Sequence, residues 1–155
     1  MPIRFKALET PLVQALQGGG TDSYGHPGER RIAGEFRVPC RHCLREVDAG
    51  DPYLTVAHRP FSGVQPYAET GPIFIHANAC DRAPETGDLP PMLSSPAYIL
   101  RGYDSDERMN YDTAGLVPRE QIVERAAEIL ADPAVAFVHV RSATATCFQC
   151  RIERA

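Results

Sequence analysis

The residues with the clearest capacity for chemistry are cysteines, and most of them come in short-spaced pairs. Thiolate sulfur and imidazole nitrogen are the donors that zinc prefers, and C-x-x-C combined with a second close pair is a common way to supply four of them. Five cysteines and one histidine form three such pairs: Cys40 with Cys43, His76 with Cys80, and Cys147 with Cys150.

Geometry favours two of these pairs over the third. Residues i and i+3 of a strand lie about 10 Å apart and point to opposite faces, whereas two thiolates on one zinc lie about 3.7 Å apart. Cys147 and Cys150 fall on an expected strand, and Cys150 alternates with apolar residues as a core residue would. The sequence therefore predicts a zinc site with four ligands: Cys40, Cys43, His76 and Cys80. Four protein ligands close the coordination sphere, so this zinc would be structural.

Three other interpretations of the cysteines remain open. The metal site could recruit Cys147 or Cys150 in place of one of the four residues above. All five thiols could be ordinary core or surface residues, because cysteine behaves as a small hydrophobe. Cys40 and Cys43 could also form a redox pair, although no βαβ pattern surrounds them and no helix is expected to start at Cys43.

A second candidate site rests on polar residues of expected strands. Arg101 lies on one strand, and His139 and Arg141 share one face of another. If the strands are neighbours, the cations could hold a carboxylate or a phosphate, which would suit an anion-binding protein or a small enzyme. Such an enzyme would need a concave pocket there, or a metal with an open position. The alternative is ordinary ion pairing with one of three carboxylates: Glu69, Asp104 or Glu153.

The elements that must position these residues are mostly strands, with one strong helix signal. Alternating or apolar β-prone segments predict the following strands: 3–7, 53–58, 73–76, 98–103, 109–113, 135–142 and 148–153. Residues 118–131 combine an initial proline with a single apolar stripe, which is typical of an amphipathic helix. We therefore expect an α+β fold that is rich in loops. An antiparallel or mixed sheet would carry one long helix, 118–131, packed on a face.

Length and composition fit a single domain that covers residues 1–155. The chain has 155 residues, 43% of them hydrophobic and 23% charged, which is typical of a globular protein. Residues 1–30 should supply a strand, a short helix that starts at Thr10-Pro11, and a flexible loop over 21–31. Residues 31–155 should form the core.

Charge and hydropathy bear on partners and on location. The formal net charge is −4, whereas a general nucleic-acid binder should present a basic face. The longest apolar runs fall far short of the roughly 20 residues of a membrane helix, and the first residues lack a signal-peptide core. We expect a soluble cytoplasmic protein that binds neither nucleic acid nor membrane.

Several short motifs together resemble the bacterial family called domain of unknown function 1203. The similarity runs from about residue 30 to the end of the chain and is carried by the following segments: Val38-Pro39-Cys40-Arg41, Pro66-Tyr67, Gly71-Pro72-Ile73-Phe74-Ile75, Arg101-Gly102-Tyr103-Asp104, Asp132-Pro133, Val138-His139-Val140-Arg141 and Cys147-Phe148. The resemblance implies a small cytoplasmic protein of one domain, and it assigns no reaction.

Overall fold

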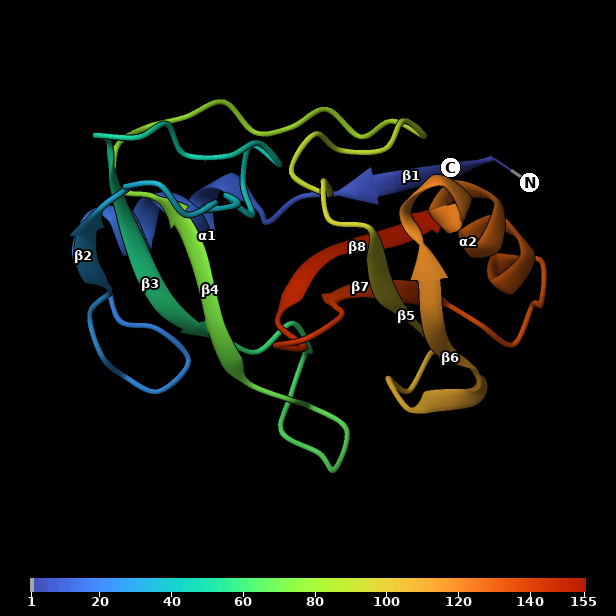
Figure 1. The fold of residues 1–155 in the computed structure, drawn as a ribbon. Coiled ribbons are helices and arrows are strands. Elements are labelled where there is room, and N and C mark those ends of the chain that lie inside the picture. The colour runs from blue at the N-terminus through green and yellow to red at the C-terminus, as the bar shows by residue number, and fades with distance from the viewer. Residues whose placement is uncertain (1) are drawn as a thin grey trace.

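Two antiparallel sheets account for most of the regular structure. A computed structural model describes residues 2–155 and shows the arrangement in Figure 1. Within these residues one sheet has five strands in the order β1-β8-β7-β5-β6, and the other has three in the order β2-β3-β4. The strands are β1 (Ile3–Lys6), β2 (Glu29–Ile32), β3 (Pro52–His58), β4 (Gly71–His76), β5 (Ala97–Tyr103), β6 (Met109–Pro118), β7 (Phe137–Ser142) and β8 (Phe148–Arg154).

The five-stranded sheet is built around β7, which pairs with β5 on one side and β8 on the other. Arg101 of β5 lies opposite His139 of β7, and Val140 of β7 lies opposite Cys150 of β8. Helix α2 (Ile122–Leu130) buries four apolar side chains against this sheet. Its apolar stripe therefore forms one wall of the larger core.

The expectation of an α+β fold with one long helix over 118–131 is wrong. The fold is mostly sheet, and α2 has only 9 residues, after a short 3-10 turn at Arg119–Gln121. Pro118, which suggested a helix start, instead ends β6 opposite Ala97 of β5. Because β6 is an edge strand, the missing N–H of Pro118 does not disrupt the ladder, and strand pairing overrides the local helix signal.

The three-stranded sheet contains one strand, β2, that the sequence pattern does not predict. Residues 21–31 were expected to form a flexible loop, yet β2 pairs with β3, with Glu29 opposite Thr55. All four residues of β2 are exposed, so the strand has no apolar alternation that could reveal it. Helix α1 (Thr10–Gln17) packs beside this sheet and buries Val13 and Leu16 in the second core.

Two long irregular segments join these elements and carry the cysteines of interest. The β2–β3 loop covers 33–51, and the β4–β5 loop covers 77–96. Figure 1 shows both segments along the same edge of the molecule, above the sheets. Loops of this length usually need a function or a clamp to order them.

No helix among residues 2–155 is long and apolar enough to cross a membrane.

Candidate metal centre

A tight turn at the tip of the β2–β3 loop brings Cys40 and Cys43 together. The backbone N–H of Cys40 donates to the carbonyl of Arg45 (2.8 Å), and the N–H of Leu44 donates to the carbonyl of Cys40 (2.9 Å). Leu44 has a φ of 57°, a left-handed conformation that few non-glycine residues adopt. The chain thus reverses directly after Cys43, and the two thiols face the same side.

The other two donors come from the end of β4 and the loop that follows it. His76 is the last residue of β4, and its backbone N–H donates to Cys40 Sγ (3.3 Å). Cys80 lies four residues further on. The Gln17 amide of α1 donates to the carbonyls of His76 (2.9 Å) and Asn78 (2.8 Å), which fixes the path of the loop between the two donors.

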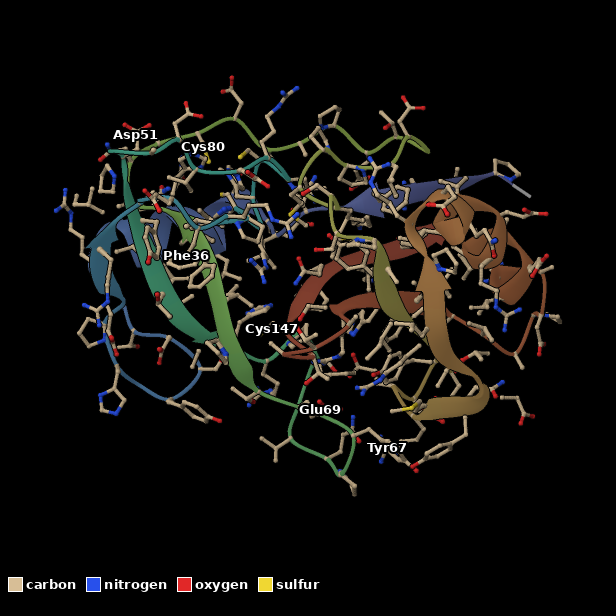
Figure 2. The ribbon with its side chains drawn as sticks, viewed as in Figure 1. Phe36, Asp51, Tyr67, Glu69, Cys80 and Cys147 are labelled. Atoms are coloured by element: carbon tan, nitrogen blue, oxygen red, sulfur yellow. The ribbon has the colours of Figure 1, made fainter. Side chains whose placement is uncertain are left out.

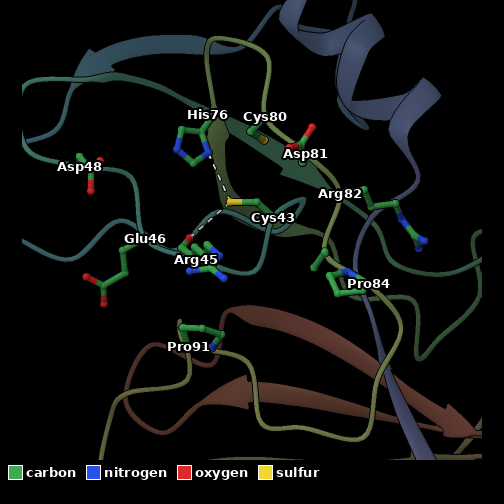
Figure 3. Close-up of a pocket in the computed structure, with 11 residues that line it drawn as sticks. Cys43, Arg45, Glu46, Asp48, His76, Cys80, Asp81, Arg82, Pro84 and Pro91 are labelled. Carbon is green, nitrogen blue, oxygen red and sulfur yellow. Dashed lines mark hydrogen bonds between the residues drawn. The ribbon is translucent and has the colours of Figure 1, made fainter.

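The four donor atoms form a compact group. Cys40, Cys43, His76 and Cys80 each offer one atom, and all four atoms lie within 4.8 Å of one another. Cys43 Sγ lies 3.6 Å from His76 Nδ1, and Cys40 Sγ lies 4.0 Å from Cys80 Sγ. Figure 3 marks the contact between Cys43 and His76 with a dashed line. Donors on a tetrahedral zinc are about 3.6–3.8 Å apart, so small side-chain shifts would close the sphere. The group could hold a metal ion.

The electrostatics of the three thiols show why a cation would suit this group. The Cys43 thiol donates to Cys40, and this bond, together with backbone N–H groups, lowers the pKa of Cys40 to about 4. The same bond and burial raise the pKa of Cys43 above its usual range. Burial and the charge on Cys40 raise the pKa of Cys80 to about 12. A bound divalent ion would favour loss of the protons from the two thiols whose pKa values are raised.

His42, which sequence reasoning did not select, contacts the donor group from its buried side. His42 is 2% exposed, and its Nδ1 lies 3.1 Å from Cys80 Sγ. Its Nε2 lies 2.9 Å from the Thr10 hydroxyl of α1. Burial lowers the pKa of His42, so the ring is neutral and donates a hydrogen bond from one nitrogen only. The available signal was its position inside the Cys40–Cys43 pair.

The donor group borders a broad cavity of about 880 Å³. Figure 3 shows Cys43, His76 and Cys80 on its wall, with charged side chains around them. Cys40, by contrast, is completely buried. The cavity gives an ion a route to the donors from solvent, which a metal site requires.

The remaining two cysteines lie outside this group. Cys150 is 1% exposed and belongs to the core of the five-stranded sheet, as its alternation predicted. Cys147 follows Thr146 at the β7–β8 turn and lines a different, smaller cavity. All five cysteines are free thiols. The structure thus groups the donors of the four-residue set and leaves both of the alternative residues apart from it.

The second candidate site is only partly assembled. Arg101 and Arg141 both approach the Glu69 carboxylate, at 2.7 Å and 3.5 Å, which is the ion pairing that the sequence left open. His139 does not join them, because it is fully buried among aromatic rings, including Phe148 at 4.8 Å between centroids. Burial holds the pKa of His139 well below its usual range, so it is neutral.

The fold and the site together describe a mostly β chain with a cysteine-rich cluster between two loops. Comparison with family models matches residues 37–154 to the "Protein of unknown function (DUF1203)" family. The match covers more than half of the chain, so the chain belongs to this family, as the sequence motifs predicted. No curated protein and no solved structure matches the chain.

Proposed function

We propose that this protein is a non-catalytic module stabilised by one structural zinc ion. Its ligands are the Sγ atoms of Cys40, Cys43 and Cys80 and the Nδ1 atom of His76. The proposal rests on one observation, the approach of these four donor atoms to within 4.8 Å of one another. The three thiols and the imidazole come from two distant parts of the chain.

The donor set favours zinc over other common ions. Calcium and magnesium take oxygen ligands, whereas three sulfurs and one nitrogen suit a borderline-soft ion such as zinc. No carboxylate belongs to the group of four. The pKa values of Cys43 and Cys80 are raised, so a strongly bound cation is needed before all three thiols become thiolates.

Four ligands and their placement support a structural role. A catalytic zinc keeps one position for water or substrate, whereas four protein donors fill the tetrahedron. Here the ion would join the β2–β3 loop to the β4–β5 loop, two long segments with little secondary structure. Its binding free energy would order both loops and, through Gln17 and His42, hold α1 against them.

The same chemistry supports a location in the cytoplasm. Zinc binds thiolates, and an oxidising compartment would compete by converting neighbouring thiols to disulfides. A reducing compartment keeps Cys40, Cys43 and Cys80 available as ligands.

Replacement of zinc by cobalt tests the ligand set directly. We expect the purified full-length protein to contain about one equivalent of zinc. Its cobalt form should show the sulfur-to-cobalt charge-transfer bands and the visible d–d bands of a tetrahedral thiolate site. Cys43→Ser should weaken these bands, and Cys147→Ser should leave them unchanged. A zinc content below about half an equivalent, or cobalt bands that depend equally on both residues, would overturn the proposal.

A further inference from the structure

A second, smaller cavity lies where the β3–β4 loop meets the β7–β8 turn. Its volume is about 150 Å³, and its walls include Glu69, Arg141 and Cys147. Figure 2 shows Glu69 and Cys147 near each other, well away from Cys80. Gly71, which also lines the cavity, begins β4, whereas the metal cluster lies at the far end of that strand. The strand's six residues separate the two sites by about 16 Å.

The most unusual group at this cavity is the guanidinium of Arg141. The residue is only 4% exposed, and its Nη1 donates to the carbonyl of Thr146 at 2.9 Å. Its Nε and Nη2 atoms are buried and have no hydrogen-bond partner among residues 2–155. A guanidinium carries five N–H donors and stays charged, so leaving several of them buried and unpaired is unfavourable. The Nε and Nη2 groups of Arg141 therefore lack hydrogen-bond acceptors, and a bound ligand could supply them.

The charges around the cavity are positive in balance. Glu69 is the one carboxylate on its wall, and it forms ion pairs with two arginines, Arg101 at 2.7 Å and Arg141 at 3.5 Å. Arg41 is a further buried cation behind the cavity wall: it is 2% exposed, and its Nε donates to the carbonyl of Phe148, a residue of that wall. One carboxylate cannot neutralise this set, so the cavity favours an additional negative group.

We propose that this cavity binds a small oxyanion, a carboxylate or a phosphate group, through Arg141. Glu69 then acts as an internal competitor that occupies the anion's place beside Arg101 and Arg141. The Glu69 side chain is 47% exposed and can turn into solvent when a ligand arrives. Arginine suits this role because its planar fork pairs with two oxygens of a carboxylate or phosphate at once. The site is independent of the proposed zinc.

Anion titrations of the full-length protein test this site. Inorganic phosphate and acetate are added separately at constant ionic strength, with chloride as the balancing anion. Backbone amide shifts in residues 141–148 report binding. Saturation by phosphate alone identifies a phosphoryl ligand, and saturation by acetate alone identifies a carboxylate. We expect at least one of them to saturate with a Kd below about 10 mM.

Three variants separate a binding role from a purely structural one. Glu69→Gln removes the competitor and should lower the Kd about fivefold, an effect that loss of a structural ion pair would not produce. Arg141→Lys keeps the charge but loses the fork, and should raise the Kd at least about tenfold. Arg125→Lys, which alters an exposed helix pair, should leave the Kd unchanged. Absence of saturation in both the parent and Glu69→Gln, or a Kd that Glu69→Gln does not lower, would overturn the proposal.

Discussion

Replacing Cys43 by serine should lower thermal stability through the metal and through little else. The Cys43 side chain is half-buried, and its sulfur lies 3.6 Å from His76 Nδ1 and 3.9 Å from the carbonyl of Arg45, beside the Cys40 thiol. Serine is similar in size, so the loss of packing alone should cost less than about 1 kcal/mol. A larger effect would have to come from the loss of a zinc ligand.

The magnitude follows from linkage. With free zinc at about 1,000 times Kd, binding stabilises the folded state by about 4.1 kcal/mol. A hundredfold weaker affinity in Cys43→Ser would leave about 1.4 kcal/mol of that. For a chain of 155 residues, unfolding entropy near 60 °C converts 1 kcal/mol into about 3 °C of Tm. The variant should therefore melt about 8 °C lower, and a chelator should lower the Tm of the parent by about 12 °C.

Cys147→Ser is a matched control for this experiment. Cys147 is also half-buried, and its sulfur also lies 3.9 Å from a backbone carbonyl two residues away. Differential scanning calorimetry with and without chelator should show a large drop for Cys43→Ser, a small one for Cys147→Ser, and near equality of all three proteins in chelator. The reasoning is refuted if the chelator moves the parent by less than about 3 °C, or if both variants melt together.

Three further outcomes follow from the geometry. His42→Ala should weaken zinc affinity about tenfold, because it removes the ring beside Cys80 Sγ. Competition with a chromophoric chelator measures the affinity, and an unchanged value would contradict this prediction. Gly102→Ala should destabilise the fold by about 1–3 kcal/mol, because its Cβ would come within 2.8–3.0 Å of side chains on β6 and α2. Gly63→Ala, with open space around it, should be neutral in the same urea titration. His58 has a pKa lowered to about 4 by burial, so the unfolded chain takes up its proton first as the pH falls. The free energy of unfolding should therefore decline between about pH 6.5 and 4, by up to about 3 kcal/mol. His58→Asn should flatten this dependence on pH, and equal slopes in the parent and the variant would exclude His58 as the cause.

The donor group was predictable from sequence because it depends on short spacings between residues and on where a strand ends. The spacing of Cys40 and Cys43 and the place of His76 at a strand end identify residues that can turn toward one ion. Exclusion of Cys150 followed from strand alternation, and the structure places it in the core. That these residues bind zinc stays a prediction, whereas their proximity is a property of the fold.

The features that sequence reasoning missed depend on contacts between distant segments. Pro118 suggests a helix start locally, but its pairing with β5 makes it the end of a strand. Strand β2 is fully exposed and owes its form to β3. His139 shares a face with Arg141, yet aromatic rings from other elements enclose it, and no pattern along β7 reveals them. The partner of His42 lies on α1, far away in the chain.

An anomalous difference map at the zinc absorption edge, from crystals of the protein purified without added metal, tests the central claim most directly. The account predicts one peak, about 2.3 Å from the sulfurs of Cys40, Cys43 and Cys80 and about 2.0–2.1 Å from His76 Nδ1. No peak among these four side chains, or a peak bound by other residues, would contradict it.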